Sequence, residues 1–295
     1  MTHLRHILAG LVAIGVSASC APAFAEPTDS AKYKLTVCAD PANLPYSNRA
    51  LAGFENEIAR VIAADLQMEL DFFWFPEHQG FLRRSLLEGL CDAVMTVPAS
   101  LGVVATTKPY FVSSYVAVMR SSDQRRFTSF DDAWLKDARI GAQLVGKEGA
   151  TTPPAMALGR RGVDAHLELF PMWAEDESAN PQGEIVTAVA TGRIDVAFVW
   201  GPFGGYFAKP YGDALKVEPI AGDPKSPEQP FTYPMSIGVR KSDVALRDKL
   251  DGALARHGDE IQQILKAHGV PLVAEQSSKP LIEQASSPAS STSTR

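Results

Sequence analysis

Histidine and cysteine are scarce in this chain. Its 295 residues include six histidines and three cysteines, and the histidines after residue 25 are scattered, without the spacing of a metal site. The sequence also contains no nucleophile elbow, no phosphate-binding loop and no glycine fingerprint of a dinucleotide-binding fold. We therefore predict a protein that is not an enzyme and that has no catalytic residues, no metal ligands and no cofactor.

Excess positive charge is also missing, as are long apolar runs after the N-terminal segment. The chain has 28 Lys and Arg against 34 Asp and Glu, so we expect neither nucleic acid nor an anionic membrane as a partner. After residue 25, no apolar run approaches the roughly 18 residues that a membrane-spanning helix requires. With 45% hydrophobic and 21% charged residues, the composition is that of a globular protein long enough for two domains.

The two ends of the chain differ from the rest in composition. Residues 1–25 are predicted to be a secretory signal peptide, because a basic start leads into an apolar run and then into the small-x-small cleavage sequence at 23–25. The alternative is a lipoprotein signal with Cys20 as acceptor, but Ser17 stands where such sites carry Leu. Residues 276–295 are polar and low in complexity, so we expect a disordered tail. The signal peptide predicts a periplasmic location.

A strand, a loop, a helix and a second strand follow the predicted signal peptide. Apolar residues at 35–38 form a strand that stops at Asp40, and apolar residues at helical spacing follow over 54–66. The next apolar run, 70–75, begins after only three residues, which indicates a βαβ unit of a parallel sheet. Ligands bind beyond the carboxyl ends of such strands. The loop at 40–48 and the start of the helix are therefore predicted to form one wall of a crevice.

Two further strands stop in the same way. A short helix at 80–90 leads into a nearly continuous apolar strand at 92–98, as expected for a strand covered on both faces. A strand within 195–203 also stops and is predicted to pass into a loop. We expect the three turns at which these strands stop to face one another across an apolar gap, near Tyr46, Pro98 and Trp200.

The order of elements predicts an α/β protein of two lobes with two hinge crossings between them. Each lobe is expected to be a mostly parallel sheet flanked by helices. Lobe 1 is assigned residues 33–112 together with 235–275, and lobe 2 is assigned residues 113–234. In lobe 2, Thr152 is predicted to be the N-cap of a helix that has Pro153 at its first position.

Cys38 and Cys91 remain after removal of the signal peptide, at the edges of predicted parallel strands. In an oxidising compartment such a pair is expected to form a disulfide. The alternative is two buried thiols that pack as small apolar side chains.

Candidate ligand-binding or partner-binding residues are mostly aromatic and lie on or beside the loops at the strand ends, where aromatic side chains often serve as anchors. They are Asp40, Asn43, Tyr46, Phe54, Phe81, Pro98, Trp173, Trp200, Phe203 and Tyr206. The alternatives are that Phe54 and Phe81 belong to the core and that Asp40 only closes a turn. Glu55 and Asp195 are given structural roles, Glu55 because the helix dipole favours a carboxylate in the first turn.

The order of short motifs over residues 33–270 resembles family 3 of the bacterial extracellular solute-binding proteins, which are two-lobed periplasmic binding proteins of type II. The motifs are Asp40 with Pro45-Tyr46-Ser47, Gly53-Phe54-Glu55, Gly89 with Cys91-Asp92-Ala93-Val94, Lys108-Pro109-Tyr110, Gly192 to Ala197 and Ile237 to Lys241. Amino-acid binders of that kind carry an Arg after the Asp-Ala-Val strand and an Asp after the lobe-2 strand. Neither is present at 98–107 or at 200–203, so we do not expect a free amino acid as ligand.

Other motifs more closely resemble the subfamily associated with quinoprotein dehydrogenases, the MxaJ and XoxJ proteins of methanol-oxidation clusters. These motifs are the run at 38–48, Gly80 to Arg83, Leu90 to Val94, Val97-Pro98 and Val199 to Pro202, although Val103 stands near the place of an Arg that is usual in that subfamily. The resemblance implies a periplasmic protein that aids maturation or activation of a PQQ-dependent methanol or alcohol dehydrogenase. That dehydrogenase and its cytochrome are the expected partners, and an apolar interlobe cleft would bind a protein segment or a small ligand.

Two alternatives to this function stay open. The first is the substrate-binding component of an ABC transporter for a small aromatic or non-zwitterionic solute. The second is a periplasmic enzyme, because the fold also includes lyases and dehydratases. We expect the protein to be a monomer.

Overall fold

The computed structural model describes residues 33–77, 80–145, 152–163, 167–173 and 180–273. The predicted signal peptide, the Cys20 alternative and the predicted C-terminal tail lie outside these residues. No helix within the described ranges is long and apolar enough to cross a membrane.

The first lobe is built on the βαβ unit expected from the sequence. Strand β1 (Lys34–Ala39) pairs in parallel with β4 (Glu69–Trp74) and with β5 (Ala93–Pro98). Helix α1 (Phe54–Asp65) covers this sheet and buries Phe54, Ile58 and Ile62 completely. The loop after β1 contains a small antiparallel pair, β2 (Ala42–Asn43) and β3 (Ser47–Asn48).

The helix predicted at 80–90 is much shorter in the structure. Helix α2 spans Phe81–Arg84, and the residues up to Gly89 form turns. The Ser85 hydroxyl donates to the Phe81 carbonyl oxygen (2.6 Å), and the Ser85 backbone leaves the helical region with φ −131° and ψ −82°. Gly89 then takes a positive φ of 75°, a conformation that glycine adopts readily. Local side-chain bonding of this kind competes with helix continuation.

The predicted disulfide is confirmed. Cys38 near the end of β1 is bonded to Cys91 just before β5, with 5.4 Å between the Cα atoms. Both residues are buried, and Phe81, Leu86 and Val94 belong to the same apolar cluster. The bond therefore ties two neighbouring strands together beneath α2.

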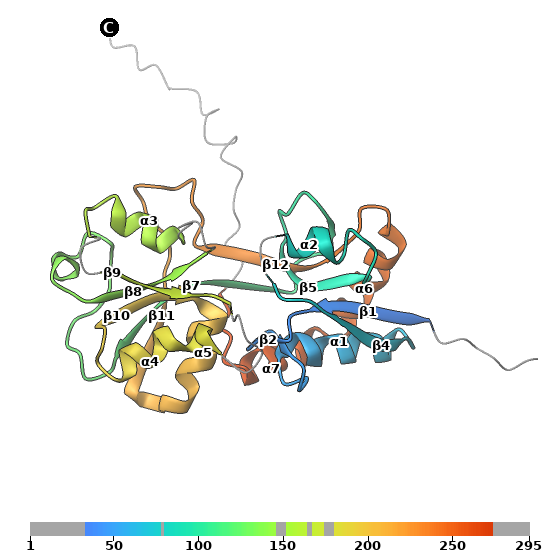
Figure 1. Ribbon diagram of the computed structural model, residues 1–295, viewed down its shortest axis with the longest axis horizontal. Coiled ribbons are helices and arrows are strands. Elements are labelled where there is room, and N and C mark those ends of the chain that lie inside the picture. The colour runs from blue at the N-terminus through green and yellow to red at the C-terminus, as the bar shows by residue number, and fades with distance from the viewer. Residues whose placement is uncertain (1–32, 78–79, 146–151, 164–166, 174–179, 274–295) are drawn as a thin grey trace, which may run out of the picture. The chain divides into compact units, whose positions relative to one another are not determined.

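Two long strands connect the halves of the molecule. The first four residues of β7 (Phe111–Arg120) pair with the start of β12 (Thr232–Val239). Beyond this pairing, β12 continues along β5 and β7 continues along β10 (Val196–Trp200). The hydrogen-bonded path is thus continuous, in the order β4-β1-β5-β12-β7-β10-β8-β9, and it divides at β7 and β12 into the two lobes visible in Figure 1.

The chain passes between the two lobes along β7 and β12. We use lobe 1 for the side that contains β1, β4, β5 and β12, and lobe 2 for the side that contains β8, β9 and β10. The finer lobe bounds, 33–112 with 235–275 and 113–234, stay predictions. In lobe 1, β6 (Ala105–Thr106) adds to β12, and helices α6 (Val244–Arg256) and α7 (Gly258–Ala267) pack against α1.

Lobe 2 has a parallel core of β10, β8 (Ile140–Leu144) and β9 (Leu167–Pro171). Strand β11 (Leu215–Pro219), which was not predicted, pairs antiparallel with β7. Helix α3 (Pro153–Gly159) has Thr152 as N-cap, as predicted. It lies on one face of the sheet, and α4 (Glu184–Ala190) and α5 (Gly201–Ala208) lie on the other (Figure 1). Short 3-10 segments occupy Ala133–Lys136, Pro181–Gly183 and Lys209–Ala214, the last of which is kinked at Gly212.

Helix α5 corrects the prediction of a loop after β10. Trp200 is its N-cap, and a proline occupies its first turn, where a missing N–H costs nothing. Two glycines within this helix, Gly204 and Gly205, allow close packing. A Cβ at Gly204 would lie 2.5 Å from Val116 Cγ2, and a Cβ at Gly205 would overlap the backbone carbonyl of Gly269. The helix can lie on β7 and the segment after α7 only because both positions lack side chains.

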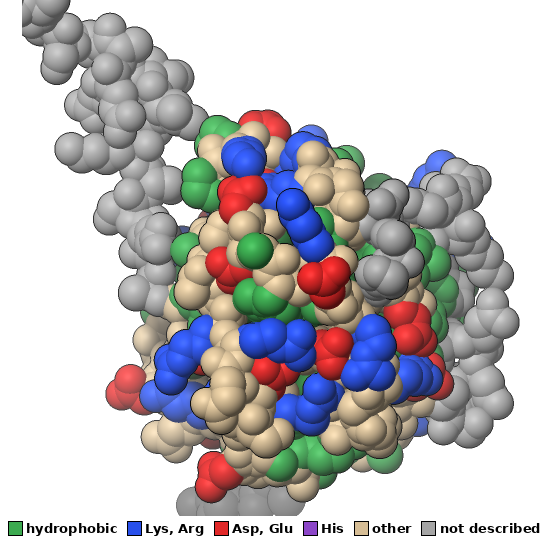
Figure 2. Space-filling model, turned by 90° about the vertical axis from the view of Figure 1, so that its left-hand side faces the viewer, with side chains coloured by type: hydrophobic (Ala, Val, Ile, Leu, Met, Phe, Trp, Pro, Cys, Tyr) green, Lys and Arg blue, Asp and Glu red, His purple; other side chains and the backbone are tan. Residues whose placement is uncertain are grey.

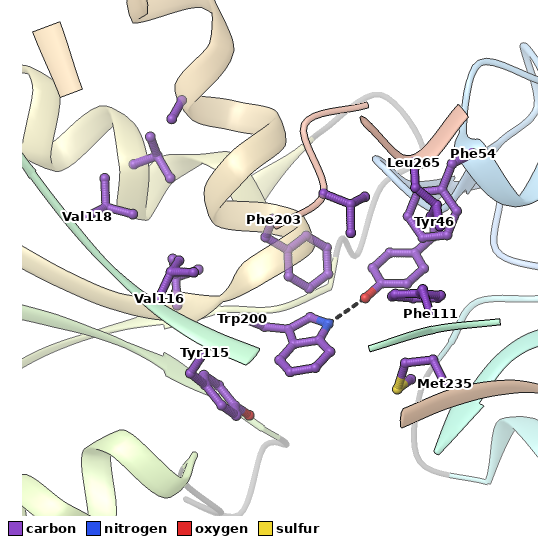
Figure 3. Close-up of a cluster of buried hydrophobic side chains, with 14 of the residues drawn as sticks. Tyr46, Phe54, Phe111, Tyr115, Val116, Val118, Trp200, Phe203, Met235 and Leu265 are labelled. Atoms are coloured by element: carbon purple, nitrogen blue, oxygen red, sulfur yellow. Dashed lines mark hydrogen bonds between the residues drawn. The ribbon is translucent and has the colours of Figure 1, made fainter. Parts of the chain in front are cut away.

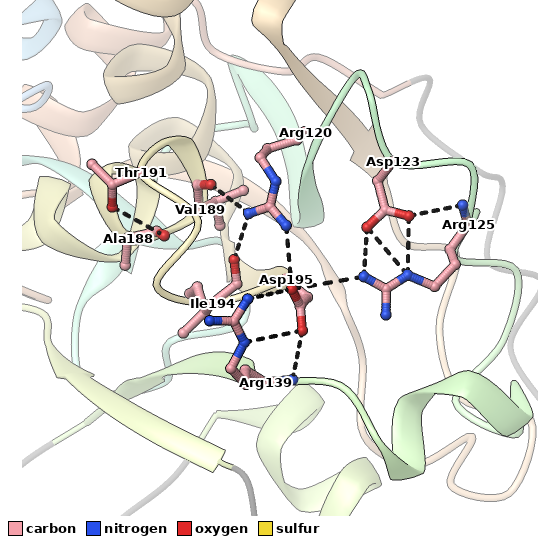
Figure 4. A network of polar contacts seen from close by, with 9 residues as sticks. All are labelled: Arg120, Asp123, Arg125, Arg139, Ala188, Val189, Thr191, Ile194 and Asp195. Carbon is pink, nitrogen blue, oxygen red and sulfur yellow. Dashed lines mark hydrogen bonds and ion pairs between the residues drawn. The ribbon is translucent and has the colours of Figure 1, made fainter.

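Asp195 has the structural role expected from the sequence. Its carboxylate accepts hydrogen bonds from the Arg139 guanidinium (2.8 Å), the Arg139 backbone N–H (3.0 Å) and Arg120 (3.2 Å), as Figure 4 shows. Burial would raise the pKa of Asp195, but the bonds from Arg139 and then Arg120 hold it well below its ordinary value. The same Arg120 donates to the carbonyl oxygens of Val189 and Ile194, so the network fixes the turn between α4 and β10.

The outer face of lobe 2 carries charges of both signs. Figure 2 shows Lys and Arg side chains beside Asp and Glu side chains across this end of the molecule. Pairs such as Arg193 with Glu168 (2.9 Å) and Lys225 with Asp131 (2.7 Å) are typical of this arrangement. The described residues of this face therefore mix the two signs of charge and form no large area of one sign that would attract an oppositely charged partner.

Candidate functional site

A cavity of about 280 Å³ lies between the two lobes, at the carboxyl ends of six parallel strands. From lobe 1, its walls come from the loops after β1 and β4, from the first turn of α1, and from β5 and β12. From lobe 2, they come from the residues that end or follow β8, β9 and β10. The lining residues are Asp40, Asn43, Tyr46, Glu55, Glu77, Thr96, Pro98 and Met235 in lobe 1, and Val145, Met172, Trp173, Trp200 and Phe203 in lobe 2.

Seven of the ten residues proposed from the sequence line this cavity: Asp40, Asn43, Tyr46, Pro98, Trp173, Trp200 and Phe203. They come together because the parallel strands of both lobes point their carboxyl ends at the same space. The structure thus places these residues in one cavity, and their contact with a ligand stays a prediction.

The other three residues lie elsewhere. Phe54 is fully buried beneath the cavity, with ring centroids 4.8 Å from Tyr46 and 6.0 Å from Phe111. Phe81 belongs to the apolar cluster around the disulfide. Tyr206 lies on α5 one turn beyond Phe203, where its ring stacks on His268 at 6.1 Å. For Phe54 and Phe81, the structure favours the alternative of a core position. Tyr206 is displaced because its segment is a helix and not a loop.

Aromatic side chains from the two lobes touch across the cavity. The Trp200 indole Nε1–H donates to the Tyr46 hydroxyl (2.5 Å), and the Tyr46 ring packs edge-on against Phe203 with centroids 5.4 Å apart, as Figure 3 shows. Tyr46 comes from the loop after β1, whereas Trp200 and Phe203 come from the end of β10 and from α5. The structure is therefore a closed arrangement, in which the walls meet through an aromatic contact.

A second contact between the lobes is polar. Gln182, which is 1% exposed, donates through Nε2 to the Ala42 carbonyl oxygen (3.1 Å) and to Asn43 Oδ1 (3.4 Å). The Asn43 side chain in turn donates a hydrogen bond through Nδ2 to the Glu77 carboxyl group (2.8 Å). One chain of hydrogen bonds thus links lobe 2 to a carboxyl group of the cavity.

Asp40 closes a turn, which was the structural alternative considered from the sequence, and its contact with a ligand stays a prediction. One carboxylate oxygen accepts from the Ala42 backbone N–H (2.7 Å), which closes the turn after β1, and the other accepts from the Glu77 backbone N–H (2.6 Å). The side chain also lines the cavity. It therefore joins the loops after β1 and β4 and adds a carboxylate to the site.

Glu55 is a cavity residue to which the sequence analysis gave only a structural role. The start of α1 is held on the loop after β1, because the backbone N–H groups of Phe54 and Glu55 donate to the carbonyl oxygens of Pro45 (2.8 Å) and Tyr46 (2.9 Å). Glu55 is consequently 8% exposed and faces the cavity. The signal was present in the sequence, since the start of this helix was predicted to border the crevice.

The environment of Glu55 disfavours a negative charge. Burial raises the pKa of Glu55 to about 8, and the neighbouring carboxyl groups of Glu77 and Asp40 act in the same direction, while a hydrogen bond with Thr96 opposes them. The Thr96 hydroxyl in turn lies 2.8 Å from the Tyr110 hydroxyl. At neutral pH, Glu55 therefore holds its proton most of the time.

The sequence analysis also missed Glu77, another cavity residue whose pKa is raised. Glu77 as a whole residue is exposed to solvent, but its carboxyl group points into the cavity beside Asn43. Burial of that end and the nearby Asp40 raise the pKa of Glu77 to about 7. The cavity predicted as apolar thus has aromatic walls and one acidic end. Within the described residues, no group of three or more Asp, Glu, His or Cys side chains is arranged to hold a metal ion.

Comparisons with known proteins agree with this architecture. The family model of the bacterial extracellular solute-binding proteins, family 3, matches residues 35–269. Protein MoxJ of Methylorubrum extorquens is 29% identical over 292 residues, which cover 91% of this chain and 96% of that protein. The crystal structure of MxaJ from Methlophaga aminisulfidivorans MPT is 26% identical with a TM-score of 0.68, covering 81% of this chain and 100% of that one.

The crystal structure of periplasmic binding protein XoxJ from Methylobacterium extorquens AM1 is 31% identical, with a TM-score of 0.66, and covers 82% of this chain and 100% of that one. The family match spans more than half of the sequence and includes the strands of both lobes. The chain therefore belongs to the bacterial extracellular solute-binding proteins, family 3, and within that family it is similar to MoxJ, MxaJ and XoxJ.

Proposed function

We propose that this protein is a periplasmic, non-catalytic binding protein of a methanol-oxidation system, which aids the maturation or activation of a PQQ-dependent alcohol dehydrogenase. The observation that carries the proposal is a cavity formed jointly by both lobes, in a chain that is similar to MoxJ over 91% of its length. The dehydrogenase and its cytochrome are the proposed partners, and the protein is proposed to act as a monomer. The predicted signal peptide supports the periplasmic location.

The size of the cavity bears on what it binds. A volume of about 280 Å³ is near the lower end of the range for small-molecule sites. While Tyr46 and Trp200 are in contact, an extended protein segment has no room between the lobes. The cavity therefore favours a small ligand, or a single side chain of the dehydrogenase, over the longer segment that the sequence analysis left open.

Deletion of the gene tests the proposal. We expect the deletion strain to contain dehydrogenase polypeptide and PQQ but several-fold less active dehydrogenase per polypeptide, and a plasmid copy to restore the activity. We also expect an affinity-tagged copy of the full chain to recover the dehydrogenase from periplasm. Unchanged specific activity, together with no recovery of the dehydrogenase, would overturn the proposal.

The second candidate is the substrate-binding component of an ABC transporter. It is favoured by the same small closed cavity, because capture of a solute between two lobes is how a transport protein would use it. A deletion strain that keeps its dehydrogenase activity and loses uptake of a solute would select this candidate. A permease and an ATPase encoded beside the gene would support it further.

A further inference from the structure

The chain returns to the hinge after helix α7. Residues 268–273, which we name the strap, run beside the first residues of β7, the part of that strand that pairs with β12. The Ser113 hydroxyl donates to the Pro271 carbonyl oxygen (2.8 Å), and the Val273 backbone N–H donates to the Val112 carbonyl oxygen (3.1 Å). The strap is therefore bound to the strand on which the chain passes between the lobes.

The start of the strap is held by both lobes. His268 is 9% exposed, and its Nε2 lies 3.0 Å from a carboxylate oxygen of Glu57 on α1, in lobe 1. The other side of the His268 ring stacks on Tyr206 of α5, in lobe 2, with centroids 6.1 Å apart. Val270, two residues further on, is buried in the apolar core. The strap is thus packed between elements that belong to different lobes.

Helix α5 touches the strap through its backbone as well. A Cβ at Gly205 would overlap the Gly269 carbonyl, so the two backbones are in direct contact. One turn further along α5, the Lys209 ammonium donates to the Ala267 carbonyl oxygen at the end of α7, where a cation is favoured by the helix dipole. Figure 1 shows α5 and α7 on the same side of the sheet, one in each lobe.

The same helix forms part of the cavity wall. Trp200 is the N-cap of α5 and Phe203 lies in its first turn, and both side chains contact Tyr46 of lobe 1. Three successive parts of one short helix therefore contact lobe 1 or the strap: the first turn at the cavity, Gly205 in the middle, and Lys209 at the end. A rotation of lobe 2 that moves the first turn away from the cavity must also slide the rest of α5 along the strap.

We infer that the strap is a conformational device that holds the cavity closed by fastening α5 of lobe 2 to the end of α7 in lobe 1. It adds a non-covalent link to the two covalent ones, β7 and β12. The lobes open only when α5 slides along it. None of the described residues that line the cavity belongs to the strap, so a ligand can occupy the cavity without displacing it. The strap acts in the same way whatever the cavity binds, and it does not depend on the proposed function.

The substitution Gly269→Ala in the full chain tests the strap. The added Cβ would lie 2.9 Å from Lys209 Cδ and 3.0 Å from the Gly205 carbonyl oxygen, so the strap must move away from α5. Solution scattering of the ligand-free variant should then give a larger radius of gyration than the wild type. Exchange of the Trp200 indole N–H, followed by NMR, should be at least about 5-fold faster, because this proton is bonded to Tyr46 only while the lobes are closed.

Gly162→Ala is the matched control. Gly162 in lobe 2 has a φ of 65°, close to the 73° of Gly269, so both substitutions carry a similar backbone cost. At Gly162, however, no atom of the described chain would lie within 4 Å of the new Cβ. Its radius of gyration and its Trp200 exchange should equal those of the wild type.

A second variant, Lys209→Gln, changes only an exposed side chain and should fold normally. Loss of the cation at the end of α7 should make Trp200 exchange about 2- to 5-fold faster, whereas Lys216→Gln, on β11 of the same lobe, should leave it unchanged. Thermal melting shows whether each variant is folded, and Lys209→Gln decides alone if Gly269→Ala is not. Wild-type scattering and exchange in the folded variants of the strap would overturn the inference, as would an equal opening of the lobes in Gly162→Ala.

Discussion

At the scale of single residues, the cavity combines carboxyl groups that would be costly to ionise with rings that are costly to expose. Glu55 shows the conflict most clearly. The N-terminus of α1 favours its negative charge, yet burial and the neighbouring carboxyl groups outweigh this effect and raise its pKa to about 8. The helix dipole therefore favours the charged form of Glu55, but its effect is too weak to decide the protonation state.

The pKa of Glu55 predicts how stability depends on pH. In the folded protein Glu55 keeps its proton up to about pH 8, whereas an unperturbed glutamate releases it near pH 4.5. Between these values the folded state binds more protons, so the free energy of unfolding should fall as the pH rises, by about 3–5 kcal/mol in total. Urea denaturation at steps from pH 5 to pH 8.5 measures this decline.

The variant Glu55→Gln should lose the part of the decline that belongs to Glu55 and should be more stable than the wild type at pH 8.5. Glu77 acts in the same direction, so a smaller slope should persist. Glu57→Gln, on the same helix, should retain the full decline. Parallel curves for the wild type and Glu55→Gln would show that Glu55 is not protonated in the folded protein.

At the scale of elements, the sequence predicted what depends on periodicity and missed what depends on close packing. Strands β1, β4, β5 and β10 and helix α1 follow from runs and spacings of apolar residues. The carboxyl ends of β1, β5 and β10 brought six of the predicted residues to the cavity, and Trp173 follows β9. Helix α5 was missed because the residues after the strand were predicted to form a loop. The role of Gly204 and Gly205 is visible only in the fold, where β7 and Gly269 lie against them.

Two acidic residues of the cavity, Glu55 and Glu77, were missed because the contacts that place them there are not local in the sequence. Glu55 follows a strand and a loop, and the sequence offers a sufficient local explanation for a carboxylate at its position. Glu77 lies after β4. In the cavity its carboxyl group accepts a hydrogen bond from Asn43, which lies in a loop 34 residues earlier in the chain. Such contacts depend on the pairing of β1 with β4, so a pattern of residues along the chain does not reveal them.

The packing of α5 predicts the effect of one added methyl group. A Cβ at Gly205 would overlap the backbone carbonyl of Gly269, which cannot move as a side chain can. We expect Gly205→Ala to lower the free energy of unfolding by about 1–3 kcal/mol, as overpacking usually does. In the control Gly159→Ala, at the end of α3, no atom lies within 4 Å of the new Cβ, so stability should be unchanged or slightly higher. Equal melting temperatures for the two variants would contradict this account of α5.

At the scale of the whole molecule, two strands carry the connection between the lobes and a few side chains hold the lobes together. The β7–β12 pairing covers four residues of each strand, so it can act as a hinge. Across the cavity, the closed arrangement depends on the contact of Tyr46 with Trp200 and Phe203 and on the amide of Gln182. Because these contacts join residues of the chain itself, the lobes can close before a ligand is bound.

The hydrogen bond between Trp200 and Tyr46 predicts a shift in the balance between open and closed lobes. Tyr46→Phe keeps the ring but removes the hydroxyl that accepts from the indole N–H, and a buried donor left without an acceptor costs about 1–3 kcal/mol. That cost falls only on the closed arrangement, so solution scattering of the ligand-free variant should show a larger radius of gyration than the wild type. Tyr233→Phe is the matched control, because the Tyr233 ring also packs against Trp200, at 5.6 Å, without accepting its hydrogen bond. Identical scattering from Tyr46→Phe and the wild type would mean that the aromatic contact does not hold the lobes closed, and closure would then depend on the amide of Gln182.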